Sequence, residues 1–235
     1  MVTLIGAQRC QMVIDRPPGH AVERVNVRAP HQPMTFKPLP GELNMPSRQN
    51  VRQSEFSELV VTPAAAVDLQ EAEAVMREVL HTDLGGYLPR WHHDLDDLEA
   101  TYLRTPGCVL LVARDVAGVV GTAAVRPCRL ASPPNPDWLA RQYNQPDVCQ
   151  LVRVWVVARA RRRGVGRALA ERAVAWSVGP GGYRRVYLHT DASVSGAEAF
   201  WRSLPTREIY DERPDPFNTV HFEIDTDALL LAAQC

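Results

Sequence analysis

The sequence almost lacks lysine, and it lacks any long apolar run. Lys37 is the single lysine among 235 residues; the other 25 basic residues are arginines, a bias that codon usage alone can produce. No apolar stretch approaches the roughly 18–20 residues that cross a bilayer. The opening residues also contain too short an apolar stretch for a secretory signal. We therefore expect a cytoplasmic protein with no membrane partner.

Paired cysteine motifs are absent as well. The five cysteines are odd in number and show no CxxC spacing, which favours buried or free thiols in a reducing cytoplasm. The formal net charge of −1 argues against a general nucleic-acid-binding role. With 46% apolar and 23% charged residues, the composition is that of an ordinary globular protein and excludes disorder along the whole chain.

Proline sets the first segment apart from the rest of the chain. Residues 1–50 hold seven of the nineteen prolines, with no sustained helical or strand periodicity. We expect an extended or disordered leader there; the alternative is that translation starts at Met34 or Met45. Residues 51–226 are expected to form the folded domain, and residues 227–235 a C-terminal tail.

From residue 56 onward, apolar periodicity switches between strand and helix types. The pattern predicts a mixed sheet with helices on both faces, rather than a regular βαβ repeat or a helix bundle. Strands are predicted at Phe56–Val61, Cys108–Ala113, Val119–Val125, Val148–Val157, Arg185–Thr190 and Val220–Ile224, with another near Ile209. Helices are predicted from an N-cap at Asp68 to Leu84, at Asp94–Leu103, around Trp138 and Tyr143, at Gly164–Val178 and at Ala197–Leu204.

The segment with the clearest chemistry runs from a strand through a glycine-bearing turn into a helix. Arg161, Arg162 and Arg163 precede Gly164 and Gly166 at this turn. A helix N-terminus offers unpaired N–H groups and the positive end of the helix dipole, so it can bind phosphate. Glycine lets the backbone approach a ligand, and arginine adds bidentate hydrogen bonds. The turn is neither a Walker loop nor a complete dinucleotide fingerprint; a solvated basic helix start is the alternative.

This turn, Arg161-x-x-Gly164-x-Gly166 after an apolar strand, resembles the [QR]xxGx[GA] motif of the GNAT superfamily of N-acetyltransferases. The likeness extends over about residues 56–225. It implies the acyl-CoA N-acyltransferase fold, an α/β (α+β) architecture with a mixed, mostly antiparallel sheet, and acetyl-CoA as co-substrate without a metal. The residues that the resemblance assigns to coenzyme A are Val154, Trp155 and Val156 on a diverging strand, Arg161, Arg162, Arg163, Gly164, Val165, Gly166, Arg167 and Ala168 at the turn, and Trp201.

Two positions depart from the family pattern. Trp201 stands where members of the family often carry the tyrosine that protonates the thiolate, and an indole N–H is not a useful acid. Tyr187 or Tyr210 could take over that role, or the thiolate could leave unassisted or through water. Gln150 stands where some members carry a glutamate that serves as the base.

A histidine supplies the alternative base. His189 falls near the end of the following strand, where other family members place a carboxylate, and its ordinary pKa of about 6.5 suits proton removal near neutrality. Asp191 would lie on the same face of that strand and could orient His189. The alternative is that His189 is a hydrogen-bonded structural residue.

The segment between the first two predicted helices is where the family builds its acceptor pocket. Tyr87, Trp91, His92 and His93 lie there beside several acidic residues, and such groups can hold a cationic amine. A metal site is disfavoured because adjacent histidines do not share a helix face. An ordinary helix start, with acidic residues near its N-terminus, is the other alternative.

We therefore expect an N-acetyltransferase that acts on an amine of a small-molecule or amino-acid-like acceptor by direct attack on the thioester. Acetylation of a protein N-terminus or lysine is the enzymatic alternative. The second alternative is a non-catalytic acyl-CoA-binding module, because the family's tyrosine and glutamate are missing. We expect no nucleic-acid partner. We do expect a homodimer, since many family members dimerise.

Overall fold

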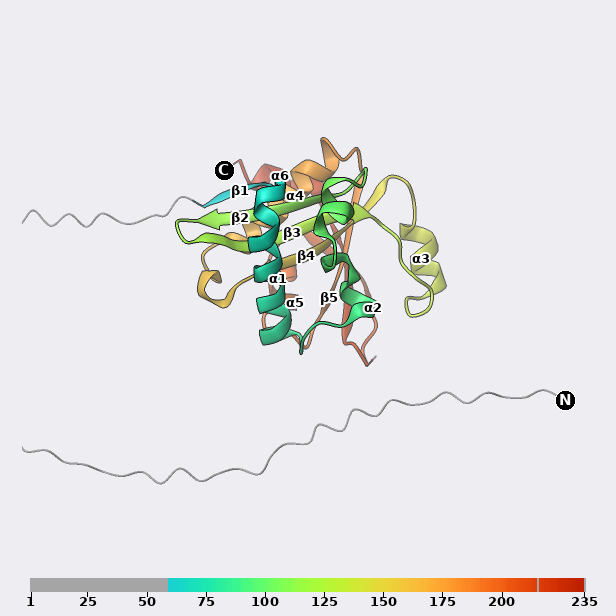
Figure 1. Cartoon of the computed structure of the whole chain (residues 1–235). Coiled ribbons are helices and arrows are strands. Elements are labelled where there is room, and N and C mark those ends of the chain that lie inside the picture. Colours follow the sequence, from blue (N-terminus) through green and yellow to red (C-terminus); the bar gives the residue numbers. More distant parts are fainter. Residues whose placement is uncertain (1–58, 215, 235) are drawn as a thin grey trace, which may run out of the picture. The chain divides into compact units, whose positions relative to one another are not determined.

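The computed structural model describes residues 59–214 and 216–234, which contain a seven-stranded sheet flanked by helices (Figure 1). The strand order is β1-β2-β3-β4-β5-β7-β6. All neighbouring pairs are antiparallel except β4 and β5, which are parallel. The expected mixed, mostly antiparallel sheet is confirmed. The leader predicted at residues 1–50, with Met34 and Met45, lies outside the described residues.

The strands lie close to their predicted positions, including the one near Ile209, although Phe56 is outside the described residues. They are β1 (Val60–Pro63), β2 (Val109–Asp115), β3 (Gly118–Pro127), β4 (Val148–Val156), β5 (Arg185–Asp191), β6 (Thr206–Asp211) and β7 (Thr219–Ile224). The helices are α1 (Leu69–Asp83), α2 (Pro89–His92), α3 (Asp137–Tyr143), α4 (Val165–Val178), α5 (Ala197–Arg202) and α6 (Thr226–Ala232). Single turns of other helix types are η1 (Ala66–Asp68), η2 (His93–Leu95), η3 (Glu99–Leu103) and η4 (Ala158–Ala160).

Helices cover both faces of the sheet. In Figure 1, α1 crosses in front of β2, β3 and β4, while α4 lies behind them. The buried face of α1 is the stripe expected from the sequence, consisting of Ala72, Val75, Met76, Val79 and Leu80. On α4, Leu169 and Ala173 are buried as expected, whereas Trp176 is only half-buried. Both helices thus hold the central strands in place through apolar contacts.

The segment expected to be a helix at Asp94–Leu103 is instead broken into short turns. The chain forms α2, then the 3₁₀ turn η2, and then the π-helical turn η3. The prediction is wrong because Asp94 does not sit at a solvated helix start: it is buried, and its carboxylate accepts hydrogen bonds from Arg153 and Tyr102. Asp68, the expected N-cap of α1, makes no side-chain capping bond to that helix and accepts from the amide of Ala65 instead.

The segment expected to be a C-terminal tail continues the fold. Residues 226–232 form α6, which packs against α4 and buries Leu229 completely. The helix begins at Asp225, whose carboxylate accepts a hydrogen bond from the amide of Ala228 at 3.0 Å. The packed domain therefore extends past residue 226.

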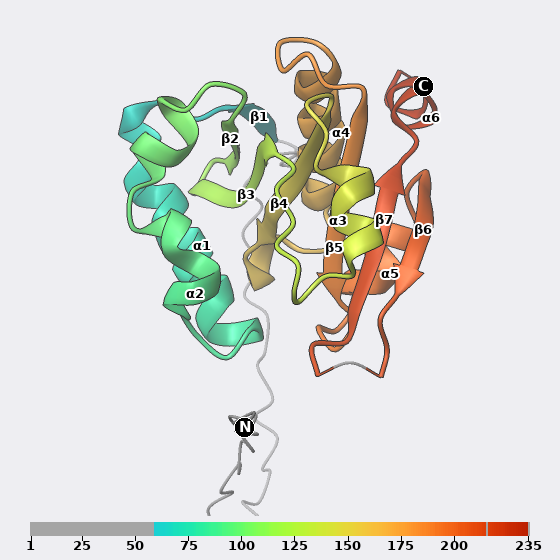
Figure 2. The same ribbon diagram turned by 90° about the vertical axis from the view of Figure 1, so that its right-hand side faces the viewer.

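The strand β4 leaves its parallel neighbour partway along its length, and this divergence shapes the site. The ladder with β5 joins Val148–Gln150 to residues 185–187 and then stops. On its other side β4 stays paired with β3 as far as Val156, across a bulge at which Arg153 has a φ of +56°. A bulge increases local twist and bends the strand, which turns the end of β4 away from β5 (Figure 2).

The interior is apolar. The largest residues with almost no exposure on the central strands are Leu110, Leu111, Tyr187, Leu188 and Phe222. In the described part, Cys108, Cys128 and Cys149 are free thiols. None of the helices in that part has both the length and the apolar character needed to cross a bilayer.

Candidate active site

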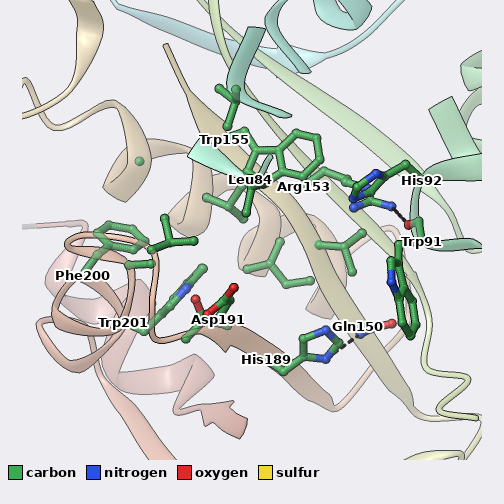
Figure 3. Close-up of a pocket in the computed structure, with 18 of the residues that line it drawn as sticks. Leu84, Trp91, His92, Gln150, Arg153, Trp155, His189, Asp191, Phe200 and Trp201 are labelled. Carbon is green, nitrogen blue, oxygen red and sulfur yellow. Dashed lines mark hydrogen bonds between the residues drawn. The ribbon is translucent and has the colours of Figure 1, made fainter. Parts of the chain in front are cut away.

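A cavity of about 1530 Å³ opens where β4 and β5 separate (Figure 3). One part, the α4 half, is bounded by the start of α4 together with Phe200 and Trp201. The other part, the α2 half, is bounded by Trp91, Gln150 and His189. The separation of two strands thus creates a continuous space between a helix N-terminus and a histidine.

The α4 half is built around the turn that leads into α4. Gly164 has a φ of +81° and Arg162 a φ of +63°, so the chain reverses through two left-handed residues. The first N–H groups of a helix have no acceptor within it, and Gly164, Val165 and Gly166 line the cavity at this point. A Cβ placed on Gly164 would meet no atom within 4 Å, so the space beside the turn is open. This arrangement suits an anionic group such as a phosphate.

Two other residues of the motif hold the turn in shape. Arg161 donates from Nε to the carbonyl of Val156 at 2.9 Å, and its guanidinium pairs with Asp83. A Cβ on Gly166 would lie 3.3 Å from the ring of Phe200, so glycine permits the close packing of α4 against that ring. The charge of Arg161 is therefore already paired, and the motif has a structural function beside any binding function.

Two of the residues assigned to coenzyme A have other partners. Arg163 extends toward Asp115, with Nη1 3.2 Å from a carboxylate oxygen. The amide of Ala168 donates to the carbonyl of Gly164 at 3.0 Å and is thus spent inside the helix. Neither residue is part of the cavity wall, so the structure argues against both assignments; Arg162 and Arg167 do lie on that wall.

The strand edge leading to the turn is the second element of the α4 half. Val154, Trp155 and Val156 lie beyond the end of the β4–β5 ladder, and all three line the cavity. Over these residues β4 has no strand partner on the β5 side within the described part of the chain. Unpaired N–H and C=O groups of an extended strand can bind an extended amide-containing ligand.

His189 lies at the point where the two strands part, with its ring open to the cavity (Figure 3). Its Nδ1 is 3.3 Å from Tyr187 Oη and 3.4 Å from Gln150 Nε2. Desolvation by the surrounding protein is the main cause that lowers the pKa of His189 to about 4, and the neighbouring His221 and Arg126 lower it further. The imidazole is therefore neutral at neutral pH, with Nε2 left for a ligand.

A series of buried polar side chains continues behind His189. Tyr187 Oη lies 2.6 Å from His221 Nδ1, and His221 Nε2 lies 3.0 Å from Glu212 Oε1 without the alignment of a hydrogen bond. The carboxylate favours a proton on Nε2 of His221, so Nδ1 accepts from the Tyr187 hydroxyl. Burial raises the pKa of Tyr187 far above its ordinary value, which makes it a poor acid for a thiolate.

The other residues expected to be catalytic are placed differently. Asp191 lines the cavity, but its carboxylate accepts from the amide and hydroxyl of Ser193 at 2.8 and 2.6 Å instead of orienting His189. Tyr210 is not part of the cavity wall; its ring packs against Trp138 and His221. These contacts argue against the orienting role of Asp191, and the position of Tyr210 argues against its role as the acid. Trp201 is buried on the cavity wall, beside Phe200.

Only some residues of the segment expected to hold the acceptor line the cavity. Trp91 and His93 are exposed and line the cavity. His92 also lines it but is buried, and its Nδ1 accepts from the amide of Leu88 at 2.9 Å, which is a structural role. Tyr87 does not line the cavity, and its hydroxyl donates to a carboxylate outside the cavity wall. In the described residues no group of three His, Cys, Asp or Glu side chains could hold a metal ion.

A buried ion pair that the sequence did not reveal supports the α2 half. Arg153 Nε donates to Asp94 Oδ2 at 2.9 Å, and its Nη2 donates to the carbonyl of Trp91 at 2.6 Å. The two charged side chains are 12% and 3% exposed. Burial alone would raise the pKa of Asp94, but hydrogen bonds from Arg153 and Tyr102 hold it below its usual range. The pair fixes α2 to the bulge of β4.

A second unforeseen contact joins β3 to β4 across the α2 half. Arg126 and Gln150 are register partners, and Arg126 donates from Nε and Nη2 to Gln150 Oε1 at 3.2 and 3.1 Å. Both residues line the cavity. The alternating pattern of each strand predicts which face of the sheet Arg126 or Gln150 occupies. It does not predict that the two residues pair, because the bulge shifts the register between β3 and β4.

Comparison with known proteins agrees with this geometry. The model of the acetyltransferase (GNAT) family matches residues 74–204, more than half of the chain. No curated protein sequence matches significantly.

Three solved structures illustrate the shared fold. A GNAT-family acetyltransferase from Staphylococcus aureus Mu50 is 16% identical, with a TM-score of 0.54 over 71% of this chain and 98% of its own. A spermidine N-acetyltransferase from Vibrio cholerae, solved with CoA and spermine, is 13% identical, with a TM-score of 0.53 over 73% and 98%. An acetyltransferase from Salmonella typhimurium, described as putative and solved with acetyl-CoA, is 15% identical, with a TM-score of 0.52 over 70% and 91%.

The residues matched by the family model include both diverging strands, the turn with Gly164 and Gly166, and all of α4. At these low identities the solved structures show the shared fold alone, whereas the family model matches the amino-acid sequence itself. Together with the architecture of the cavity, the match shows that the chain belongs to the GNAT family of acetyltransferases.

Proposed function

We propose that this protein is an N-acetyltransferase that transfers the acetyl group of acetyl-CoA to an amine of a small molecule. The observation that carries the proposal is the divergence of β4 from β5, which sets a phosphate-binding helix start at one end of a cavity and a neutral histidine at the other. A family relative holds acetyl-CoA in a structure of the same fold.

The residues of the α4 half fit this co-substrate. The open space beside Gly164 and the first-turn amides of α4 suit the pyrophosphate, while the free edge of Val154–Val156 suits the amide-containing pantetheine arm. When bound, acetyl-CoA supplies a thioester whose acyl group an amine can attack. Phe200 and Trp201 give that end of the cavity an apolar wall.

His189 is proposed as the group that takes the proton from the amine. With a pKa of about 4, its ring is neutral over the whole neutral range and so is always available as an acceptor, although a weak one. The Tyr187 hydroxyl donates toward His221, so its oxygen favours an N–H on Nδ1 of His189 and a lone pair on Nε2. The Gln150 contact at 3.4 Å opposes that tautomer but is the longer of the two.

The α2 half favours a small acceptor over a protein. Trp91 on α2 and Phe217 in the β6–β7 connection meet edge to face, with ring centroids 6.0 Å apart, and both line the cavity. This contact joins α2 to the β6–β7 connection at the cavity wall and so favours a small acceptor, whereas a protein substrate would need an open groove.

Replacing His189 with Ala tests the proposed chemistry. We expect kcat, measured as thiol release from acetyl-CoA with an amine panel, to fall by roughly 100-fold or more, the scale of a general base. The affinity for acetyl-CoA should hold, because His189 is remote from the turn at Gly164. An exposed histidine on α1, His81, gives the matched control, since His81→Ala should leave kcat and affinity unchanged.

Two outcomes would contradict the proposal. An unchanged kcat in His189→Ala would remove this residue from the mechanism. Tight acetyl-CoA binding by the unmodified protein without turnover of any amine or peptide would favour a non-catalytic acyl-CoA-binding module.

A further inference from the structure

Three arginines without a carboxylate partner line the α2 half of the cavity. They are Arg90 on α2, Arg126 on β3 and Arg129 just after β3. Among residues 59–214 and 216–234, no acidic side chain forms an ion pair with any of them. Three other arginines of the cavity wall do pair with carboxylates: Arg153 with Asp94, Arg161 with Asp83 and Arg167 with Glu171. The α2 half therefore carries positive charge that no acidic side chain of the described residues pairs with directly.

Arg126 is held in position by a neutral group. Gln150 Oε1 accepts from both Nε and Nη2 of Arg126, so the guanidinium is oriented while its charge is retained. Arg126 is half-buried, and a half-buried charge without a counter-ion is unfavourable unless a ligand supplies one. A glutamate at position 150 would have supplied it; glutamine leaves the charge to a ligand.

The nearby acidic groups form their hydrogen bonds with other residues, although Asp94 attracts Arg126 at longer range. Asp94 is bound by Arg153 and Tyr102, and Asp191 by the Ser193 turn. Glu212 lies against His221. A polyamine would thus meet few free carboxylates here, whereas an anion would meet arginines without a carboxylate partner.

This positive region is separate from the helix start that would bind the co-substrate phosphates. Gly121 of β3 pairs with Val156 next to that turn, whereas Arg126 pairs with Gln150. Arg126 is five positions farther along the extended strand than Gly121, roughly 17 Å. Arg126 lies instead near His189, since Gln150 contacts Arg126 through Oε1 and His189 through Nε2.

We propose that the acceptor carries an anionic group, a carboxylate a few bonds from its amine as in an amino acid, and that Arg126 binds this group. Arg129 and Arg90 add positive charge around it. Gln150 sets the spacing, because it holds Arg126 on one side and touches His189 on the other. This inference rests on the proposed function, since it assigns the substrate class of the same site.

The test compares amines that differ only in the anion. Thiol release from acetyl-CoA is measured with common amino acids and, for each, with its primary amide and its decarboxylated amine; spermidine serves as the polycationic probe. We expect kcat/KM for the amino acid to exceed that for its amide by roughly 10- to 100-fold, the worth of a hydrogen bond to a charged group.

Two variants then locate the effect. Arg126→Gln removes the charge, and Gln150→Glu neutralises it while Arg126 stays in place; both should abolish the preference for the carboxylate through KM, with KM for acetyl-CoA unchanged. The matched control is Arg172→Gln on the exposed side of α4, an arginine outside the cavity wall, which should retain the preference. If both Gln150→Glu and Arg126→Gln retain the preference for the carboxylate, the inference is overturned.

Equal kcat/KM for amino acids and amides in the unmodified protein would also overturn it, as would preferred turnover of spermidine or of a peptide. If no amine is turned over at all, the proposed function fails but the subsite can still be tested by calorimetry. N-acetyl amino acids should then bind the CoA-loaded protein, at least 10-fold more weakly in Arg126→Gln. No binding by the unmodified protein would end the inference.

Discussion

At the scale of single residues, the site depends on charges placed where water is scarce. Asp94 and Arg153 form an ion pair that is largely withdrawn from solvent, and the pair ties α2 to the β4 bulge. Such a pair adds little over an apolar replacement of both partners, but removing one partner leaves an uncompensated buried charge. The geometry of the α2 half thus relies on both members being present.

Asp94→Ala is therefore expected to lower the free energy of unfolding by about 3–5 kcal/mol. Urea denaturation followed by circular dichroism measures this. Glu73→Ala is the matched control, because Glu73 also pairs with an arginine, Arg77 at 2.7 Å, but both side chains are at least 40% exposed. The control should lose less than about 1 kcal/mol, and an equal loss in the two variants would show that Arg153 finds another partner.

At the scale of elements, the turn before α4 combines a strained backbone with an open surface. Gly164 adopts a left-handed conformation and has no neighbour where a side chain would extend. A β-branched residue there would meet only the backbone penalty, about 1–2 kcal/mol, and would fill the space beside the first-turn amides.

Gly164→Val should thus cost stability and also raise KM for acetyl-CoA, by 10-fold or more if the pyrophosphate contacts this turn. Gly182→Val gives a close control, since Gly182 has a φ of +69° and equally open surroundings but lies after the end of α4. Thermal unfolding should report similar losses for both variants. An acetyl-CoA KM raised equally in both would trace the effect to stability rather than to binding.

Much of this element could be predicted from the sequence, because its signals are local. The arginines, the two glycines and the apolar stripe with Leu169 lie within one short stretch, so spacing alone placed the turn and the helix. Asp94 and Arg153 are far apart in the chain, and their contact requires the bulge at Arg153, which no local pattern announces. For that reason the sequence predicts a helix start at Asp94 and gives no sign of the unpaired charge at Arg126.

At the scale of the whole molecule, the C-terminal helix completes the packing around α4. α6 lies at the end of the described chain, yet Leu229 contributes to the same core as the central strands. A residue so placed loses both its transfer free energy and its packing contacts when it is truncated.

Leu229→Ala is expected to lower the free energy of unfolding by about 2–5 kcal/mol. On the same helix Leu231 is 64% exposed, and Leu231→Ala should change the free energy of unfolding by no more than about 0.5 kcal/mol. Chemical denaturation of the two variants side by side would decide whether α6 is part of the cooperative unit; equal effects would mean that it is not.

The early end of the β4–β5 ladder also has a mechanical consequence. Within the sheet of the described residues, strands β1 to β4 are joined to strands β5, β7 and β6 through only three residue pairs. A pantetheine arm lying along Val154–Val156 would act as an additional rung between them. The co-substrate would then link the two groups of strands where β4 and β5 separate. Its concentration would therefore set the rigidity of the enzyme as well as its rate.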